Sequence, residues 1–155
     1  MQIVGTGNQK TELVNYVKEL KISKNVDFKG QIKQKELMKC FKEAHIFLFP
    51  TLESAGFVIL EAMNNYLPIL ALDYGGPKQF VKENINLQLV SSDLSIEEIE
   101  DQLANKILEL YKNSELRIKI GLANFKTVGD NFTWENKVKS ILNIYAKVTL
   151  KQDLE

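Results

Sequence analysis

The sequence predicts an α/β fold built on a parallel, doubly wound sheet, and three observations support this. Short apolar runs typical of strands lie at residues 3–4, 26–28, 46–49 and 69–72, and segments with helical spacing of apolar residues separate them. The run at 46–49 is apolar throughout, as expected for a strand that is covered on both faces. Strands that alternate with helices favour parallel pairing through right-handed crossovers.

Composition predicts a single globular domain that spans residues 1–155. Hydrophobic residues make up 45% of the chain, which is enough for a packed core. Twenty basic and twenty acidic residues cancel, so the charge balance does not favour a nucleic-acid partner. The single cysteine, Cys40, excludes an internal disulfide and fits a reducing compartment such as the cytoplasm. No apolar run approaches the roughly 20 residues of a membrane span.

In the first half of the chain, each strand is expected to lead through a turn into a helix. Gly5-Thr6-Gly7 ends the first strand, and Asn8 is expected to cap the helix that follows it. Gly30 closes the second strand, and a helix is expected over residues 36–43. Gly5-Thr6-Gly7 is half of a dinucleotide fingerprint, but Lys10 stands where the third glycine belongs. We therefore interpret these glycines as a strand-to-helix turn.

The second half is expected to contain two more short elements and then three long helices. A short helix is predicted near residues 79–82, and a fifth strand at 87–90. Ser95 and Glu98 have the spacing of a capping box, which predicts the start of a long amphipathic helix. Another helix is predicted over residues 114–127. Phe132-Thr133-Trp134 should cap a final helix, whose apolar face is formed by Val138, Ile141, Leu142 and Tyr145.

The stretch from residue 50 to residue 81 carries the features that indicate function. A loop at residues 51–56 connects a strand to the apolar helix FVILEAM, which we expect to be buried. The N–H groups of a helix's first turn attract anions such as phosphate. Glu53 on the loop and Glu61 in the helix supply carboxylates that can accept hydrogen bonds from sugar hydroxyls. This combination suits a ligand that contains both phosphates and sugars.

These residues resemble a known family. The run ESAGFVILE, from Glu53 to Glu61, has the E-x7-E spacing of retaining GT-B glycosyltransferases (glycosyl transferases group 1, family 4). The likeness continues through Leu67-Pro68, Asp73 and Gly75-Gly76-Pro77. The chain resembles the C-terminal, donor-binding domain of such an enzyme, which implies a Rossmann-like fold that forms the C-terminal half of GT-B.

The resemblance also implies a role for each site residue. Glu53 would be the catalytic residue that contacts the donor sugar, and Glu61 would hold the ribose hydroxyls of the nucleotide. The backbone of the intervening residues would contact the diphosphate and the sugar, and that of two earlier residues the nucleobase: Ser54, Ala55, Gly56, Phe57 and Val58, and Gln31 and Ile32. The family commonly has an aromatic residue or glycine where this chain has Ala55, which leaves the donor sugar open.

The implied function is the transfer of a sugar from a nucleotide-diphospho-sugar to an acceptor with retention of configuration. No cofactor or metal is expected, because the nucleotide-sugar is a substrate and helix dipoles with backbone N–H groups can stabilise the diphosphate. Polysaccharide biosynthesis in the cytoplasm, with the whole enzyme peripheral at the membrane, fits this family. The alternatives are a GT-B nucleotide-sugar epimerase domain and a non-catalytic binding module or remnant.

The resemblance further implies that the domain is truncated at its N-terminus. The family's donor domain begins one strand and one helix earlier, with an Arg and a Lys that contact the diphosphate, and its acceptor site lies in another domain. We therefore expect this chain alone to transfer no sugar. Without the first, central strand, the sheet could close up between residues 3–4 and 46–49, or a second copy could cover the gap. We favour the homodimer.

Three residues are assigned structural roles. His45 precedes a buried strand with no cluster of metal-ligating residues near it in sequence, so we expect no catalytic or metal-binding role. Cys40 falls on the apolar face of its helix and is expected in the core. Asp73 is interpreted as a turn residue.

Overall fold

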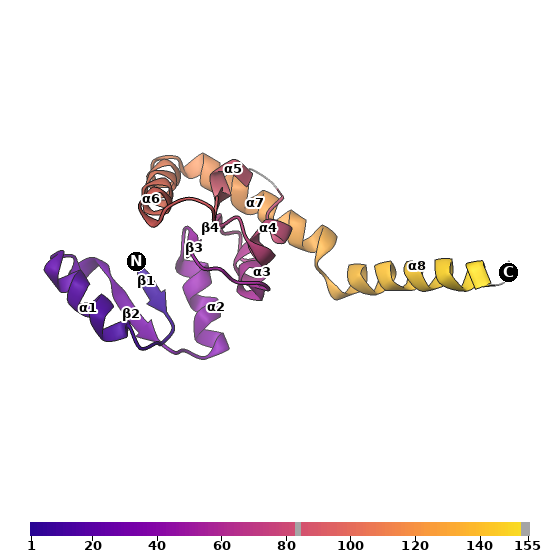
Figure 1. Cartoon of the computed structure of the whole chain (residues 1–155), viewed down its shortest axis with the longest axis horizontal. Coiled ribbons are helices and arrows are strands. Elements are labelled where there is room, and N and C mark those ends of the chain that lie inside the picture. The colour runs from indigo at the N-terminus through magenta and orange to yellow at the C-terminus, as the bar shows by residue number, and fades with distance from the viewer. Residues whose placement is uncertain (83–84, 153–155) are drawn as a thin grey trace. The chain divides into compact units, whose positions relative to one another are not determined.

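The computed structural model describes residues 1–82 and 85–152. The chain forms two compact units, one from residue 1 to residue 42 and one from residue 43 onward. The described strands form two sheets with purely parallel pairing, ordered β1-β2 in the first unit and β3-β4-β5 in the second (Figure 1). The expected α/β fold with parallel strands is confirmed, but its strands are divided between two sheets.

The N-terminal unit contains two strands, each followed by a helix. Its elements are β1 (Gln2–Val4), α1 (Lys10–Glu19), the 3-10 turn η1 (Ser23–Asn25), β2 (Asp27–Gly30) and α2 (Gln34–Glu43). The prediction that Asn8 caps the first helix is wrong, because α1 begins one residue later, with Gln9 as its N-cap and no side-chain cap hydrogen bond. The backbone N–H of Gly5 instead donates to Gly30 at 2.8 Å and extends the pairing of β1 with β2.

The sheet of the C-terminal unit consists of β3 (Phe47–Phe49), β4 (Ile69–Leu72) and β5 (Leu89–Val90). β4 is the middle strand, and all four of its residues are buried. This explains its uniformly apolar sequence, because neither face of the strand meets water. β5 is shorter than predicted, since α5 (Ile85–Gln88) occupies the residues before it.

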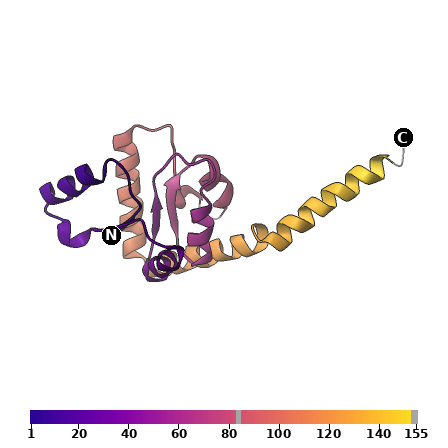
Figure 2. The same ribbon diagram turned by 90° about the horizontal axis from the view of Figure 1, so that it is seen from below.

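Helices cover both faces of this sheet. Besides α5, the helices described in the C-terminal unit are α3 (Phe57–Asn64), α4 (Gly75–Phe80), α6 (Ile96–Lys112), α7 (Ser114–Asn131) and α8 (Trp134–Gln152). Two views agree that α3 and α6 lie on opposite faces of the sheet (Figures 1 and 2). Leu70 and Leu72 of β4 pack with residues of α6 and α7 in the main core cluster, which also contains Val90, Leu103, Leu110 and Ile120.

The start of α6 confirms the predicted capping box. The Ser95 hydroxyl accepts from the Glu98 backbone N–H at 3.2 Å, and the Glu98 carboxylate accepts from the Ser95 N–H at 2.9 Å. The hydrogen bonds from the Ser95 backbone and side chain lower the pKa of Glu98, because they stabilise its charged form. The local sequence therefore determined where this helix begins.

A buried polar network joins α7 to β4 and α5. The side chains of Gln88 and Asn124 are both fully buried and bond each other. The Gln88 carbonyl also accepts from the Ile69 N–H at 2.8 Å, and the Asn124 amide donates to the carbonyl of Leu67 at 2.9 Å. Each amide thus satisfies backbone groups at the start of β4 that would be costly to bury alone.

None of the residues 134–149 of α8 is buried. The apolar residues expected on one of its faces are all exposed, and for Ile141, Leu142 and Tyr145 the exposed fractions are 47%, 58% and 65%. Its first turn is capped by Thr133, whose hydroxyl accepts from the Asn136 N–H at 3.3 Å. The described residues contain no helix that is both long and apolar enough to span a membrane.

Candidate functional site

The predicted strand, loop and helix N-terminus are present in the C-terminal unit. β3 ends at Phe49, residues 51–56 form a loop, and α3 begins at Phe57. Gly56 is the N-cap of α3 and has a left-handed backbone, with φ 63° and ψ 39°. Glycine adopts this conformation without the steric cost that a Cβ adds. The chain can therefore turn sharply from the carboxyl end of the strand into the helix.

The first turn of α3 lacks the usual side-chain acceptor. Serine, threonine, asparagine or aspartate at an N-cap accepts from the N–H groups of the first turn, whereas Gly56 has no side chain and no cap hydrogen bond is present. The N–H of Ile59 donates to the Gly56 carbonyl at 2.9 Å. The N–H groups of Phe57 and Val58 lie ahead of it, in the part of a helix that has no intrahelical acceptor. Such groups, at the positive end of the helix dipole, can bind an anion.

The loop places a carboxylate beside this helix end. Glu53 is half-buried, and its Oε1 accepts from the backbone N–H of Ala55 at 3.3 Å. Ser54 is exposed and Ala55 is half-buried. In this structure the Ala55 N–H, which we expected to contact a ligand, is therefore held by Glu53 across a long hydrogen bond.

α3 presents one face to the core and leaves the other open. Ile59, Ala62 and Met63 are fully buried, whereas the Phe57 side chain is 70% exposed. Glu61 follows Phe57 by one helical turn on the same face and is half-buried. The expectation of a wholly buried helix is therefore wrong, because only one face of α3 packs against the core. The open face leaves the Glu61 side chain partly accessible.

The two residues predicted to contact a nucleobase belong to the N-terminal unit. Gln31 and Ile32 directly follow β2, and Gly30, the last residue of that strand, has φ 67°. The Gln31 side chain is exposed and that of Ile32 is half-buried. Both lie at the carboxyl end of a parallel strand, the edge where ligands bind in α/β sheets.

The pair Gly75-Gly76 supports the loop, a relation that sequence reasoning missed. We expected a turn there and a helix from residue 79, but α4 already begins at Gly75. Pro77 is compatible with this start, because the N–H groups of a first turn need no intrahelical acceptor. A Cβ placed on Gly76 would lie 1.8 Å from the Ala55 carbonyl oxygen, and one on Gly75 would lie 2.4 Å from the Glu53 carbonyl oxygen. The loop thus rests directly on the backbone of α4.

An aromatic pair joins the start of α3 to the end of α4. The rings of Phe57 and Phe80 are stacked, with centroids 6.3 Å apart and planes inclined by 24°. Phe80 also meets Phe132 edge-on, with centroids 5.3 Å apart. The ring contact therefore joins the start of α3 to the end of α4, whereas the loop at residues 51–56 meets the backbone at the start of α4. Aromatic spacing along the sequence could not have indicated this contact, since Phe57 and Phe80 belong to different elements.

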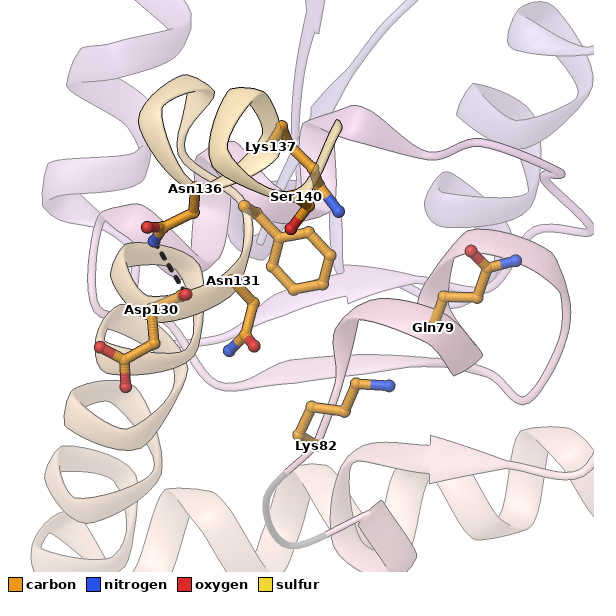
Figure 3. A pocket seen from close by; sticks show the side chains of 8 residues that line it. Gln79, Lys82, Asp130, Asn131, Asn136, Lys137 and Ser140 are labelled. Carbon is orange, nitrogen blue, oxygen red and sulfur yellow. Dashed lines mark hydrogen bonds between the residues drawn. The ribbon is translucent and has the colours of Figure 1, made fainter. Parts of the chain in front are cut away.

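A polar hollow of about 440 Å³ lies between the end of α4 and the corner that joins α7 to α8 (Figure 3). Its lining residues are Gln79, Lys82, Asp130, Asn131, Phe132, Asn136, Lys137 and Ser140. The Asn136 side chain stabilises the corner, because its amide donates to the backbone carbonyls of Gly129 and Asp130 at 2.9 and 2.8 Å. The Lys137 ammonium lies 5.0 Å from the centre of the Phe132 ring. None of the predicted site residues lines this hollow.

The three residues assigned structural roles have varied surroundings. His45 is exposed just before β3. Cys40 is half-buried on α2, so its expected place in the core is only partly correct. Asp73 follows β4 and forms an ion pair with Lys78 at 3.4 Å. The described residues contain no group of three or more His, Cys, Asp or Glu side chains that could hold a metal ion.

Comparison with known proteins identifies related sequences. Residues 1–127 match the family model described as "Glycosyl transferases group 1". The poly(ribitol-phosphate) alpha-N-acetylglucosaminyltransferase of Staphylococcus aureus (strain COL) is 26% identical over 145 residues, which cover 92% of this chain and 28% of that protein. The GDP-mannose-dependent monoacylated alpha-(1-6)-phosphatidylinositol monomannoside mannosyltransferase of Corynebacterium glutamicum is 27% identical over 150 residues, which cover 92% and 37%. The chain thus spans about a third of the length of these relatives.

Solved structures show the same architecture. S. aureus TarM, crystallised as a mutant with fondaparinux, alpha-GlcNAc-glycerol and UDP, aligns with a TM-score of 0.78 and 25% identity over 93% of this chain and 28% of that one. Sucrose-phosphate synthase from Thermosynechococcus elongatus aligns with a TM-score of 0.77 and 23% identity over 97% and 38%. The chain therefore belongs to the glycosyl transferases group 1 family, and its fold is that of the C-terminal half of a GT-B glycosyltransferase.

Proposed function

We propose that this chain is the donor-binding part of a retaining glycosyltransferase. The complete enzyme would transfer a sugar from a nucleotide-diphospho-sugar to an acceptor. Family membership supports the reaction class. The TarM structure that resembles this chain was solved with UDP, which supports a nucleotide ligand for this fold.

One observation carries the proposal: α3 begins, without a side-chain cap, at the end of a loop that holds a carboxylate. Gly56 leaves the first-turn N–H groups without a side-chain acceptor, and Glu53 precedes it by three residues. A diphosphate needs hydrogen-bond donors and positive potential, which the helix end supplies. A sugar needs carboxylate acceptors, which the loop supplies. Both needs are met within a few residues of chain.

The site residues then take distinct roles. Glu53 accepts hydrogen bonds from the donor sugar, and Glu61, on the open face of α3, accepts them from the ribose. The backbone between Ser54 and Val58 donates to the diphosphate and the sugar. For the donor to use the Ala55 N–H, it would replace the hydrogen bond from that group to Glu53. Gln31 and Ile32 would contact the nucleobase through their backbone.

The site would accelerate the reaction by electrostatic stabilisation of the transition state. In the transition state, positive charge develops on the sugar ring and negative charge on the leaving diphosphate. Preoriented N–H groups and a helix dipole stabilise the departing anion, and a carboxylate near the ring stabilises the cation. This set of groups supports a mechanism in which the protein itself neutralises the diphosphate. Retention of configuration is part of the proposal and rests on the E-x7-E spacing of Glu53 and Glu61.

The acceptor would be bound by a part of the enzyme other than this chain. The relatives are about three times as long as the segment they share with it, and GT-B enzymes bind their substrates between two domains. We therefore expect the 155-residue chain alone to bind nucleoside diphosphate weakly and to transfer no sugar.

Exchanging Glu61 for glutamine tests the ribose contact. In the complete enzyme, Glu61→Gln should weaken nucleoside diphosphate binding by about ten- to a hundredfold, because a hydrogen bond to a charged group contributes roughly 1.5–3 kcal/mol. Calorimetry measures the change. The matched control is Glu97→Gln, at an exposed position on α6, which should bind as the unmodified protein does. Equal affinity of both variants for the nucleotide would remove Glu61 from the site.

A further inference from the structure

The backbone contact between the loop at residues 51–56 and α4 is unusually close. The Gly76 N–H donates a long hydrogen bond to the Glu53 carbonyl oxygen, with the nitrogen and oxygen 3.4 Å apart. A Cβ on Gly76 would also lie 2.6 Å from the Ala55 carbonyl carbon. Real Cβ atoms do not approach other atoms so closely, and the atoms in the way belong to backbone, which cannot swing aside. Glycine is therefore required at this position by the present path of the loop.

Gly75 adds a second constraint on the same loop. Its φ is 52°, a left-handed conformation that is strained for alanine, because the Cβ comes too close to the backbone. A Cβ there would lie 2.9 Å from the Ser54 Cα and 3.1 Å from the Ser54 carbonyl oxygen, in addition to its clash with Glu53. Gly75 and Gly76 thus lie directly against the backbone of three consecutive loop residues, 53–55.

The other glycines of the C-terminal unit show that this is a local feature. A Cβ on Gly129, in α7, would meet no atom within 4 Å. A Cβ on Gly121 would lie 2.1 Å from the Tyr66 carbonyl oxygen, so α7 also needs a glycine for close packing, but against the turn after α3. Only at Gly75 and Gly76, among the described glycines of this unit, would a Cβ press on the carbonyl groups of the Glu53 loop.

We propose that Gly75 and Gly76 are positioning residues for the donor site. They let the loop lie against the first turn of α4, and this contact sets the place of the Glu53 carboxylate and of the loop N–H groups relative to α3. The inference rests on the proposed function, since it assigns Glu53 to the donor. A side chain on either glycine would lift the loop and misplace Glu53 without removing any group that contacts the donor.

The positional part of the proposal is tested on the 155-residue chain without any ligand. Gly76→Ala should shift the ¹⁵N–¹H NMR signals of residues 53–56 well beyond those of α6 and α7, because the loop must move. Gly129→Ala is the control with open space around its Cβ, and Gly121→Ala is the control with a backbone clash elsewhere. Neither should shift the loop signals. If the loop signals of folded Gly76→Ala match those of Gly129→Ala, the proposal is overturned.

The catalytic part is tested in the complete enzyme. A displacement of about 1 Å in a reacting group can cost a hundredfold in rate, so kcat/KM for the donor should fall by roughly that factor in Gly76→Ala. KM for the acceptor should stay unchanged, as should all constants of Gly129→Ala. A shifted loop with unchanged donor kinetics would overturn the positioning role. Loss of transfer in Glu53→Ala would then show that the proposed function itself still holds.

A failure of Gly76→Ala to fold is covered by a second variant. In Gly75→Ala the clash is smaller, because the new Cβ would lie 2.4 Å from its nearest carbonyl oxygen, compared with 1.8 Å in Gly76→Ala. The same NMR and kinetic measurements are made on this variant. If both variants fail to fold while Gly121→Ala folds, the two glycines are determinants of the fold and the proposal is overturned.

Discussion

Glu53→Ala in the complete enzyme should reduce sugar transfer by about ten- to a hundredfold. The variant removes a carboxylate whose hydrogen bonds to the donor sugar should contribute roughly 1.5–3 kcal/mol, and each 1.4 kcal/mol corresponds to a factor of ten. Steady-state transfer measures this loss. Binding of the free nucleoside diphosphate, which has no donor sugar, should change much less.

Two further variants distinguish loss of the contact between Glu53 and the donor sugar from a change in the conformation of the loop. Because the Glu53 carboxylate also accepts from the Ala55 N–H, alanine could loosen the loop. Glu53→Gln keeps an acceptor oxygen for that N–H but loses the charge, so its transfer should remain well below that of the unmodified enzyme. Glu97→Ala, at an exposed position on α6, should be fully active. Equal losses in transfer and in nucleotide binding would place Glu53 on the nucleotide and contradict the assignment.

Asn124→Ala should destabilise the C-terminal unit by about 2–5 kcal/mol. The substitution removes the buried hydrogen bonds that the Asn124 side chain makes with Gln88 and with the Leu67 carbonyl, and loss of a partner for a buried polar group costs roughly 1–3 kcal/mol. A cavity in place of the amide adds to this cost. Urea unfolding of the 155-residue chain, followed by circular dichroism, measures the change in the free energy of unfolding.

The matched control for this variant is Asn105→Ala. Asn105 lies exposed on α6, where alanine is a better helix former than asparagine, so stability should stay within about 0.5 kcal/mol. If Asn124→Ala were as stable as this control, the network of Gln88 and Asn124 would not hold α7 to the start of β4. The expected loss concerns stability alone and is independent of any ligand.

The order of strands and helices could be predicted from sequence because its signals are local. Apolar runs identified β3 and β4, and the spacing of Ser95 and Glu98 identified the start of α6. The family resemblance carried by residues 53–61 is confirmed by the match over residues 1–127. Boundaries were less predictable where a residue suits two conformations. Gly75-Gly76-Pro77 fits a turn, but it also fits the first turn of a helix, and α4 begins there.

The geometry of the site could be predicted only in part. The strand, the loop and the helix end adjoin one another in the sequence, so their succession already indicated an anion site. The contact of Gly76 with Ala55 joins residues 21 positions apart, and no local pattern signals it. The open face of α3 was missed for a similar reason. Phe57 is apolar, yet its ring stacks on Phe80 at the surface and remains largely exposed.

A crystal structure of the complete enzyme with a bound nucleoside diphosphate tests the central claim most directly. The account predicts diphosphate oxygens within about 2.7–3.2 Å of backbone nitrogens between Gly56 and Val58. It also predicts that the Glu61 carboxylate accepts hydrogen bonds from the ribose hydroxyls. A nucleotide bound away from the N-terminus of α3, with Glu61 in contact with protein groups alone, would contradict it.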